Sequence, residues 1–191
     1  VIGNAVYYPV LIDLFRMFYL QRCGIRLKKE YAGIYAHACC HVGMAQIYGT
    51  NDTKEVSGGW HDAGDYGRYI VAGAVAVADL LLAWQENRLL FERSYHIPNE
   101  SGLPDFLEEI KYELDWMLKM QDEKTGGVYH KVTCQSFPGF VMPEKETEPL
   151  VISPISATAT ADFAAVFALV YEVYKEFDKD FADGCLAAAR Y

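Results

Sequence analysis

The chain has 191 residues, of which 52% are hydrophobic, 14% aromatic and 23% charged. This apolar fraction excludes a disordered chain and is sufficient for a sizeable core, so we expect one domain or a large part of one. Because 26 Asp and Glu outnumber 17 Lys and Arg, the net charge is −9, which excludes a general nucleic-acid-binding function.

Neither a membrane-spanning segment nor a signal peptide is predicted. The longest apolar stretch, residues 69–84, contains Asp79 and is shorter than the ~20 residues that cross a bilayer. The first residues lack a basic region followed by an apolar run, but a chain that begins without Met says nothing about its native compartment. Five cysteines lying among histidines favour a metal site or free thiols over a disulfide framework.

Helical periodicity dominates the chain. An apolar stripe at i, i+3, i+4 spacing marks residues 10–22, and residues 67–90 are apolar on nearly all sides, as in a helix buried between neighbours. Pro104 followed by acidic residues favours a helix N-terminus. We therefore expect five helices, at residues 10–22, 67–90, 104–121, 153–175 and 180–191.

Little β structure is predicted. Residues 127–133 alternate weakly and form the expected short β element. Two long connections, residues 23–66 and 122–152, are of the kind that usually carries function. Helices joined by such loops indicate an all-α layered or toroidal domain. Five helices offer too few partners for their apolar faces, so residues 1–191 are expected to be the N-terminal portion of a larger domain.

A set of metal-ligand side chains lies in and around the first loop. Two thiols and two imidazoles with C-x16-C-H-x19-H spacing are typical donors of a closed, structural zinc site; they are Cys23, Cys40, His41 and His61. The spacing matches no compact zinc finger, so buried cysteines and locally bonded histidines remain the alternative. Cys39 and His37 are competing ligands, and Cys134 and Cys185 are expected to be isolated thiols.

Two carboxylates lie in a glycine-rich turn that leads into the second long helix. Asp62 and Asp65 are separated by Ala-Gly within the segment SGGWHDAGDYGRY, residues 57–69. Two close carboxylates have separated pKa values, so one can act as a base while the other orients water. Alternatively, either Asp caps the helix, or the pair belongs to a calcium loop, although too few oxygen ligands follow for the latter.

Six separated segments, in order along the chain, closely resemble the motifs of glycoside hydrolase family 9, the inverting cellulases with an (α/α)6 barrel. The likeness is to the zinc-containing subgroup, and Ala38 stands where the family's His-Pro-Ala-Cys-His element has Pro. The segments are residues 18–24, 37–41, 57–69, 126–133, 137–143 and 153–163.

The resemblance implies an all-α, incomplete (α/α)6 barrel with long loops. It also implies an endo-β-1,4-glucanase that hydrolyses its substrate with inversion. Asp65 falls on the family's catalytic base and Asp62 on the carboxylate that helps to hold the attacking water. Tyr66, His130 and Lys131 fall at or near positions that contact glucose, with plain loop residues as the alternative for the last two.

The resemblance also assigns the metal ligands. The subgroup's structural zinc ligands fall on Cys23, Cys40, His41 and His61. Calcium is expected mainly at positions outside this chain. The family's general acid is a Glu near the C-terminal end of the barrel, which these residues do not include; Glu144, Glu146 and Glu148 match no acid motif. This chain alone is therefore expected to be weakly active or inactive.

Further expectations follow from the family rather than from the residues. The substrate is a β-1,4-glucan or a cello-oligosaccharide, the enzyme is secreted, and the partners are the rest of the barrel and, in some members, an N-terminal immunoglobulin-like domain. Two alternatives stay open. One is an exo-acting glucanase or glucosaminidase of the same family, and the other is a non-catalytic, zinc-stabilised glucan-binding fragment.

Overall fold

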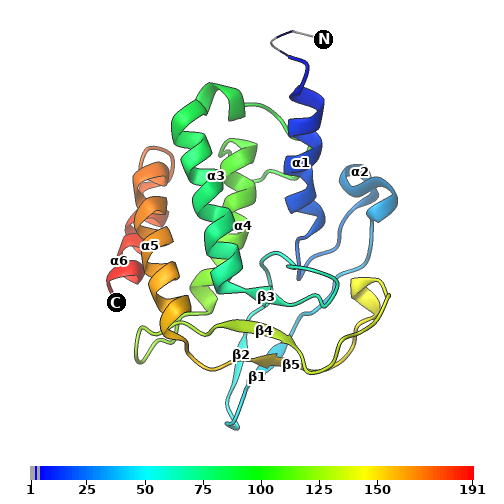
Figure 1. Ribbon diagram of the computed structural model, residues 1–191, viewed down its shortest axis with the longest axis vertical. Coiled ribbons are helices and arrows are strands. Elements are labelled where there is room, and N and C mark those ends of the chain that lie inside the picture. The colour runs from blue at the N-terminus through cyan, green and yellow to red at the C-terminus, as the bar shows by residue number, and fades with distance from the viewer. Residues whose placement is uncertain (1–2, 4) are drawn as a thin grey trace.

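The computed structural model describes residue 3 and residues 5–191, and in it helices stand side by side above a small sheet (Figure 1). The five predicted helices are present, with ends that differ from the prediction by at most four residues. They are α1 (Tyr8–Leu20), α3 (Ile70–Phe91), α4 (Asp105–Lys119), α5 (Ala157–Tyr174) and α6 (Lys179–Arg190). The predicted loops also contain a short helix, α2 (Lys29–Ala32), and 3-10 turns at Gly33–Tyr35 and Pro143–Lys145.

Local signals explain where several helices begin. The Ser156 hydroxyl accepts a hydrogen bond from the Ala159 amide at the start of α5, and the Asp178 carboxylate accepts one from the Phe181 amide at the start of α6. Such caps satisfy amides that lack a partner within the helix. Proline lies in the first turn of α1, where no amide hydrogen is needed.

The sheet is more extensive than predicted. Its strands in the described part of the chain are β1 (Met44–Ile47), β2 (Thr53–Glu55), β3 (Arg68–Tyr69), β4 (Lys131–Cys134) and β5 (Leu150–Ile152). They form one sheet in the order β2-β1-β5-β4-β3, with β1 and β5 parallel and the other pairs antiparallel. The predicted β element at residues 127–133 includes the first three of the four residues of β4 but begins four residues too early. The other strands have two to four residues each, too few for an alternating pattern to emerge.

The helices pack in pairs, α3 against α5 and α5 against α6, while α4 packs on α3 and α1. Aromatic side chains fill the centre, where Phe106 stacks on Phe15 and on Trp84. The expectation that residues 67–90 are buried on all sides is wrong for the described residues, because α3 leaves Val75 57% and Leu82 48% exposed.

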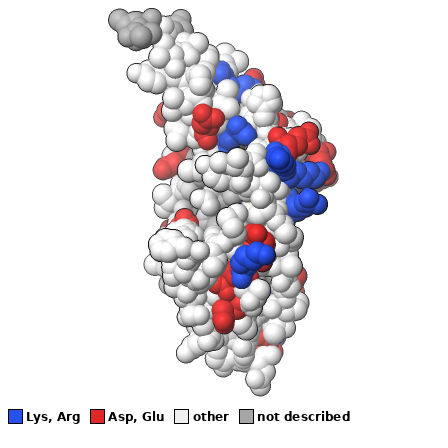
Figure 2. Space-filling model, turned by 90° about the vertical axis from the view of Figure 1, so that its right-hand side faces the viewer, with Lys and Arg blue, Asp and Glu red and all other residues white. Residues whose placement is uncertain are grey.

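By length and composition alone, α3 and α5 are each long and apolar enough to cross a membrane. Core helices of soluble proteins meet the same criterion, and these two helices pack against each other. The absence of a membrane-spanning segment therefore stays a prediction. On the face shown in Figure 2, acidic and basic side chains lie next to one another between wide uncharged areas.

Candidate active site and metal centre

The turn that carries the two carboxylates is closed by its own backbone. The Asp62 amide donates to the Gly67 carbonyl at 2.9 Å, and the Tyr66 amide donates to the Ala63 carbonyl at 3.0 Å. Tyr66 has φ +52°, a left-handed conformation that is uncommon for a residue with a bulky side chain. Strain of this kind is concentrated at functional sites.

Asp65 is half-buried and is oriented by two donors from the residues that follow it. The Tyr69 hydroxyl donates to Oδ2 at 2.7 Å, and the Gly67 amide donates to Oδ1 at 3.1 Å. Burial, with the Asp65 carboxylate, raises the pKa of Tyr69 to about 12, so the phenol stays protonated and keeps donating. The carboxylate is thus fixed in direction while each oxygen keeps a second lone pair for a ligand.

Glycine at position 67 makes this arrangement possible. A Cβ there would lie 2.7 Å from the Tyr69 ring and 3.0 Å from the Asp65 carboxylate. The helix-capping alternative is wrong for both carboxylates, because the residue at the N-cap of α3 is Tyr69 and no side chain caps the helix.

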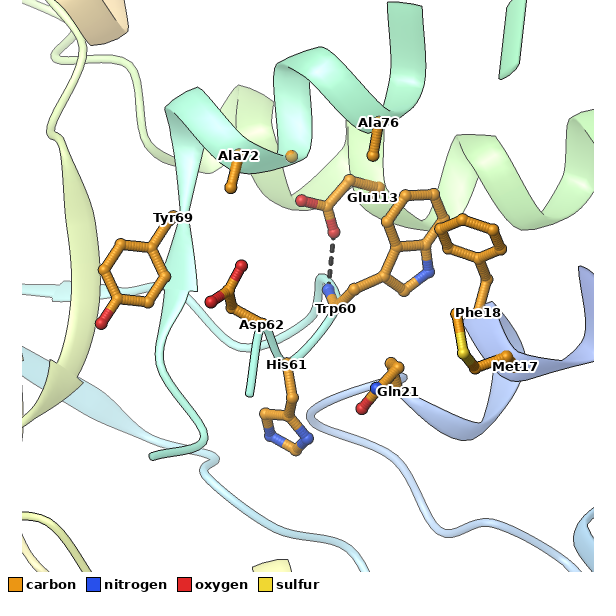
Figure 3. A pocket seen from close by; sticks show the side chains of 11 residues that line it. Met17, Phe18, Gln21, Trp60, His61, Asp62, Tyr69, Ala72, Ala76 and Glu113 are labelled. Atoms are coloured by element: carbon orange, nitrogen blue, oxygen red, sulfur yellow. Dashed lines mark hydrogen bonds between the residues drawn. The ribbon is translucent and has the colours of Figure 1, made fainter. Parts of the chain in front are cut away.

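Asp62 is exposed and lines a small pocket between the turn, α1, α3 and α4. The pocket has a volume of about 150 Å³, and Figure 3 shows the side chains that line it. Its walls combine polar and apolar groups and comprise Met17, Phe18, Gln21, Trp60, His61, Asp62, Tyr69, Ala72, Gly73, Ala76 and Glu113.

The three predicted glucose contacts lie around the turn in different ways. Lys131 is opposite Tyr69 in the β3–β4 pairing, and its ammonium lies 5.1 Å from the centre of the Tyr69 ring. His130 is half-buried and its backbone connects the start of α3 to the chain before α5. Tyr66 donates its hydroxyl proton to the Val141 carbonyl, so it ties the turn to the loop before η2 (Pro143–Lys145).

The four predicted metal ligands converge, although they come from distant positions. Their donor atoms all lie within 4.8 Å of one another, and all four side chains are buried. The His61 Nε2 atom lies 3.2 Å from His41 Nδ1 and 4.0 Å from Cys40 Sγ. Donors of a tetrahedral zinc ion lie about 3.3–3.8 Å apart, from Zn–N and Zn–S distances of 2.0–2.3 Å. The separations of 3.2 and 4.0 Å lie within about 0.2 Å of this range, so the types and spacing of these donors are compatible with a zinc ion.

The charges at this cluster also suit a cation. Hydrogen bonds lower the pKa of the Cys40 thiol. The bond with the Cys23 thiol has the largest effect, and His41 and His61 contribute others. Burial raises the pKa of the Cys23 thiol. Burial lowers the pKa of His61, which leaves its imidazole neutral and able to bind a metal. The buried His41 Nε2 atom has no hydrogen-bond partner among the described residues.

The competing residues lie apart from this cluster. Cys39 is exposed and its thiol donates to the Gly24 carbonyl, while the ring of the half-buried His37 contacts the Ala38 carbonyl. Cys134 and Cys185 are buried free thiols, as predicted.

Sequence reasoning missed a buried network of ionisable side chains beneath the turn. Arg22 donates to Glu109 at 3.0 Å, and the same carboxylate oxygen accepts the Trp60 indole N–H at 2.9 Å. Glu113, one helical turn further along α4, accepts the Trp60 backbone N–H at 2.6 Å. Glu109 and Glu113 are completely buried, and their i, i+4 spacing beside the apolar stripe of residues 104–121 was the available signal.

Arg68 is the other buried charge near the turn. Its side chain is completely buried, and Nη1 donates to the carbonyls of Val56 at 2.6 Å and Gly58 at 2.7 Å. These two carbonyls precede the turn and Arg68 follows it. The guanidinium therefore joins the two ends of the segment that carries Asp62 and Asp65.

Comparison with known proteins places this architecture in a family. The profile of glycosyl hydrolase family 9 matches residues 7–191. The chain belongs to glycosyl hydrolase family 9. The family resemblance and the expectation of a mostly helical, incomplete barrel are thereby confirmed.

Relatives in family 9 are substantially longer than this chain. A cellodextrinase of Butyrivibrio fibrisolvens is 49% identical over 187 residues, which cover 95% of this chain and 34% of the relative. Endoglucanase D of Acetivibrio thermocellus is 40% identical to this chain, and the match covers 33% of its length. The structure of AaCel9A in complex with cellobiose-like isofagomine has a TM-score of 0.94 and 44% identity, and the match covers all of this chain and 37% of that one. The chain thus spans about a third of the length of the curated relatives it matches.

Proposed function

We propose that this chain is the base-bearing, N-terminal part of the catalytic domain of an inverting β-1,4-glucanase that acts on cellulose-like glucans or cello-oligosaccharides. The observation that carries the proposal is the Asp65 carboxylate, half-buried and aimed by Tyr69 and Gly67, in a chain of family 9. The names of its relatives, a cellodextrinase and an endoglucanase, support this substrate class.

In the proposed reaction, Asp65 removes a proton from a water molecule as the water oxygen attacks the anomeric carbon of a bound glucose unit. Asp62, exposed at the neighbouring pocket, holds the same water. A carboxylic acid on the opposite face of the sugar protonates the departing glycosidic oxygen. Inverting enzymes keep the two carboxyl groups ~6.5–9.5 Å apart to leave room for the water. We assign that acid to the part of the protein outside these residues.

The substrate contacts are proposed to come from the rim of the turn. His130 is assigned a hydrogen bond to a glucose hydroxyl, and Tyr66 shapes the site beside the base. Lys131 contributes through its position against Tyr69, which itself holds Asp65. Action within the glucan chain is favoured, and product lengths from cellohexaose would distinguish it from exo-action.

We further propose that zinc occupies the cluster of Cys23, Cys40, His41 and His61. A closed set of four protein ligands leaves no position for water, so the ion supplies structural stability and no chemistry. His61 immediately precedes Asp62, and the metal would therefore fix one end of the turn. Secretion is proposed from family membership, and calcium is assigned to positions outside this chain.

Substitution of Asp65 by Asn tests the proposed function. In the polypeptide that carries this chain, hydrolysis of cellotetraose should fall by about 10²–10⁴-fold, because the amide has the same shape but cannot accept the proton. Binding of cellotetraose, measured by calorimetry, should remain. The matched control is Asp52→Asn, a change of an exposed carboxylate in the β1–β2 connection. Turnover of the Asp65 variant within tenfold of the wild type would contradict the assignment, and an initially released β-anomer would contradict inversion.

A further inference from the structure

A buried carboxylate lies directly beneath the turn that carries the proposed base. Glu113 is 1% exposed, and its Oε2 atom accepts the Trp60 backbone N–H at 2.6 Å. Its other oxygen, Oε1, accepts no hydrogen bond from the described residues and points toward the side of the pocket where Asp62 and Tyr69 lie (Figure 3). The carboxyl group thus links α4 to the backbone two residues before Asp62.

The bond to Glu113 is one of a series that holds the backbone leading into the turn. The Gly59 carbonyl accepts from the Cys23 amide at 2.8 Å, and the His61 amide donates to the Gln21 carbonyl at 2.8 Å. Between these two contacts with the end of α1, the Trp60 amide faces the other way, toward α4. From the side of α4, Glu113 therefore holds the Trp60 backbone, while Glu109 holds the Trp60 indole.

The carboxyl group is also confined from the side of α3. A Cβ added at Gly73 would lie 2.5 Å from Glu113 Oε1, closer than real Cβ atoms approach another atom. Alanine favours helix over glycine, so helix stability does not explain glycine at this position. The absence of a side chain at position 73 leaves the space in which the carboxyl group reaches Trp60.

We propose that Glu113 is a positioning residue for the proposed hydrolysis, acting through the Trp60 amide to set the place of Asp62 and Asp65. The inference rests on the proposed function. Glu113 does not touch the reacting atoms in this role. It prevents the turn from shifting, and a shift of about 1 Å at a catalytic group costs on the order of 100-fold in rate.

Two independent changes disturb the contact, and each has a matched partner. Glu113→Leu removes the acceptor, whereas Glu113→Gln keeps an oxygen that can accept from Trp60. Gly73→Ala pushes the carboxyl group away from α3, whereas Gly184→Ala, also within a helix, meets no neighbouring atom. These variants are made in the polypeptide that carries this chain, and kcat and KM are measured on cellotetraose.

Glu113→Leu and Gly73→Ala should each lower kcat by about 10–100-fold with KM within about threefold of the wild type. Glu113→Gln and Gly184→Ala should stay within about threefold for both constants. In a Glu113→Ala background, Gly73→Ala should have no additional effect, because the clash is gone. Unchanged kcat in both Glu113→Leu and Gly73→Ala would overturn the proposal, and so would an equal loss in Glu113→Gln.

A second measurement separates this proposal from the proposed function. If the wild type does not hydrolyse cellotetraose, the proposed function fails. The positioning role is then decided by backbone amide resonances of the ¹⁵N-labelled protein. Glu113→Leu and Gly73→Ala must shift the amides of Trp60 and of residues 62–66, and Gly184→Ala must not. Unshifted resonances in those residues would overturn it. Should Glu113→Leu fail to fold, the comparison of Gly73→Ala with Gly184→Ala decides.

Discussion

Replacing Glu113 by Gln should change how the stability of the chain depends on pH. Burial raises the pKa of Glu113 to about 8 from its ordinary value of 4.5, although the Trp60 amide and the Arg68 guanidinium act in the opposite direction and Glu109 adds to the rise. The folded chain therefore keeps this carboxyl group protonated at neutral pH, whereas the unfolded chain loses the proton above about pH 4.5. Gln has a similar shape and no proton to lose.

The size of the effect follows from these two pKa values. One pKa unit corresponds to about 1.36 kcal/mol, so a pKa of about 8 in place of 4.5 amounts to about 5 kcal/mol at most. Because the folded-state pKa is the higher one, the contribution of the protonated group is complete below pH 4.5. It declines as pH rises and is lost once pH passes about 8.

The assay is urea unfolding of the wild type and of Glu113→Gln at pH 5, 6, 7 and 8, in the same metal state. Between pH 5 and pH 8 the unfolding free energy of the wild type should fall relative to that of the variant by up to about 4 kcal/mol. Taking the difference removes the contributions of groups that do not interact with Glu113. Glu86→Gln, a change of an exposed carboxylate on α3, should run parallel to the wild type. Parallel curves for the wild type and Glu113→Gln would refute the reasoning.

Two further changes test the metal cluster and the packing of the turn. Cys40→Ser should abolish stoichiometric zinc binding and lower the melting temperature by about 10 °C, as expected for a loss of about 3 kcal/mol in a chain of this size. The control Cys39→Ser should change neither zinc binding nor the melting temperature. Equal zinc content in the wild type and both variants would contradict the site. Gly59→Ala should destabilise by about 3 kcal/mol or more in urea unfolding, because φ is +77° and a Cβ would lie 2.6 Å from the Trp116 ring. Gly49 has φ +80° and open space where a Cβ would lie, so Gly49→Ala should lower the unfolding free energy by only about 1 kcal/mol. Equal losses of unfolding free energy at both positions would argue against the clash at Gly59.

The helices were predictable because each carries many turns of a repeating pattern. The apolar stripe of residues 104–121 located α4 to within two residues at each end. The sheet was not predictable in the same way, because its strands are short and pair across the chain, as Gln46 does with Val151. Pairing at such separation leaves no signal within one window of sequence.

The candidate site divides along a similar line. Asp62 and Asp65 were found because they lie in one short, unusual segment, and the four donors around His61 were assigned through family resemblance and are brought together by the fold. Glu113 was missed because a glutamate on a helix is ordinarily solvent-exposed. Its burial is explained by the hydrogen bond from the Trp60 amide, and Trp60 lies 53 residues earlier in the sequence.

Arg68 gives the turn the character of a closed ring. By donating to the Val56 and Gly58 carbonyls, its guanidinium connects the end of the turn to its beginning, so both ends of the turn are held in place. The neighbouring loop is tied to the same turn, because Val141, next to the fully exposed Phe140, accepts the Tyr66 hydroxyl proton. Under the proposed function, a glucan would thus meet a base carried on a backbone segment that is held at both ends, rather than on a loop that closes over the substrate.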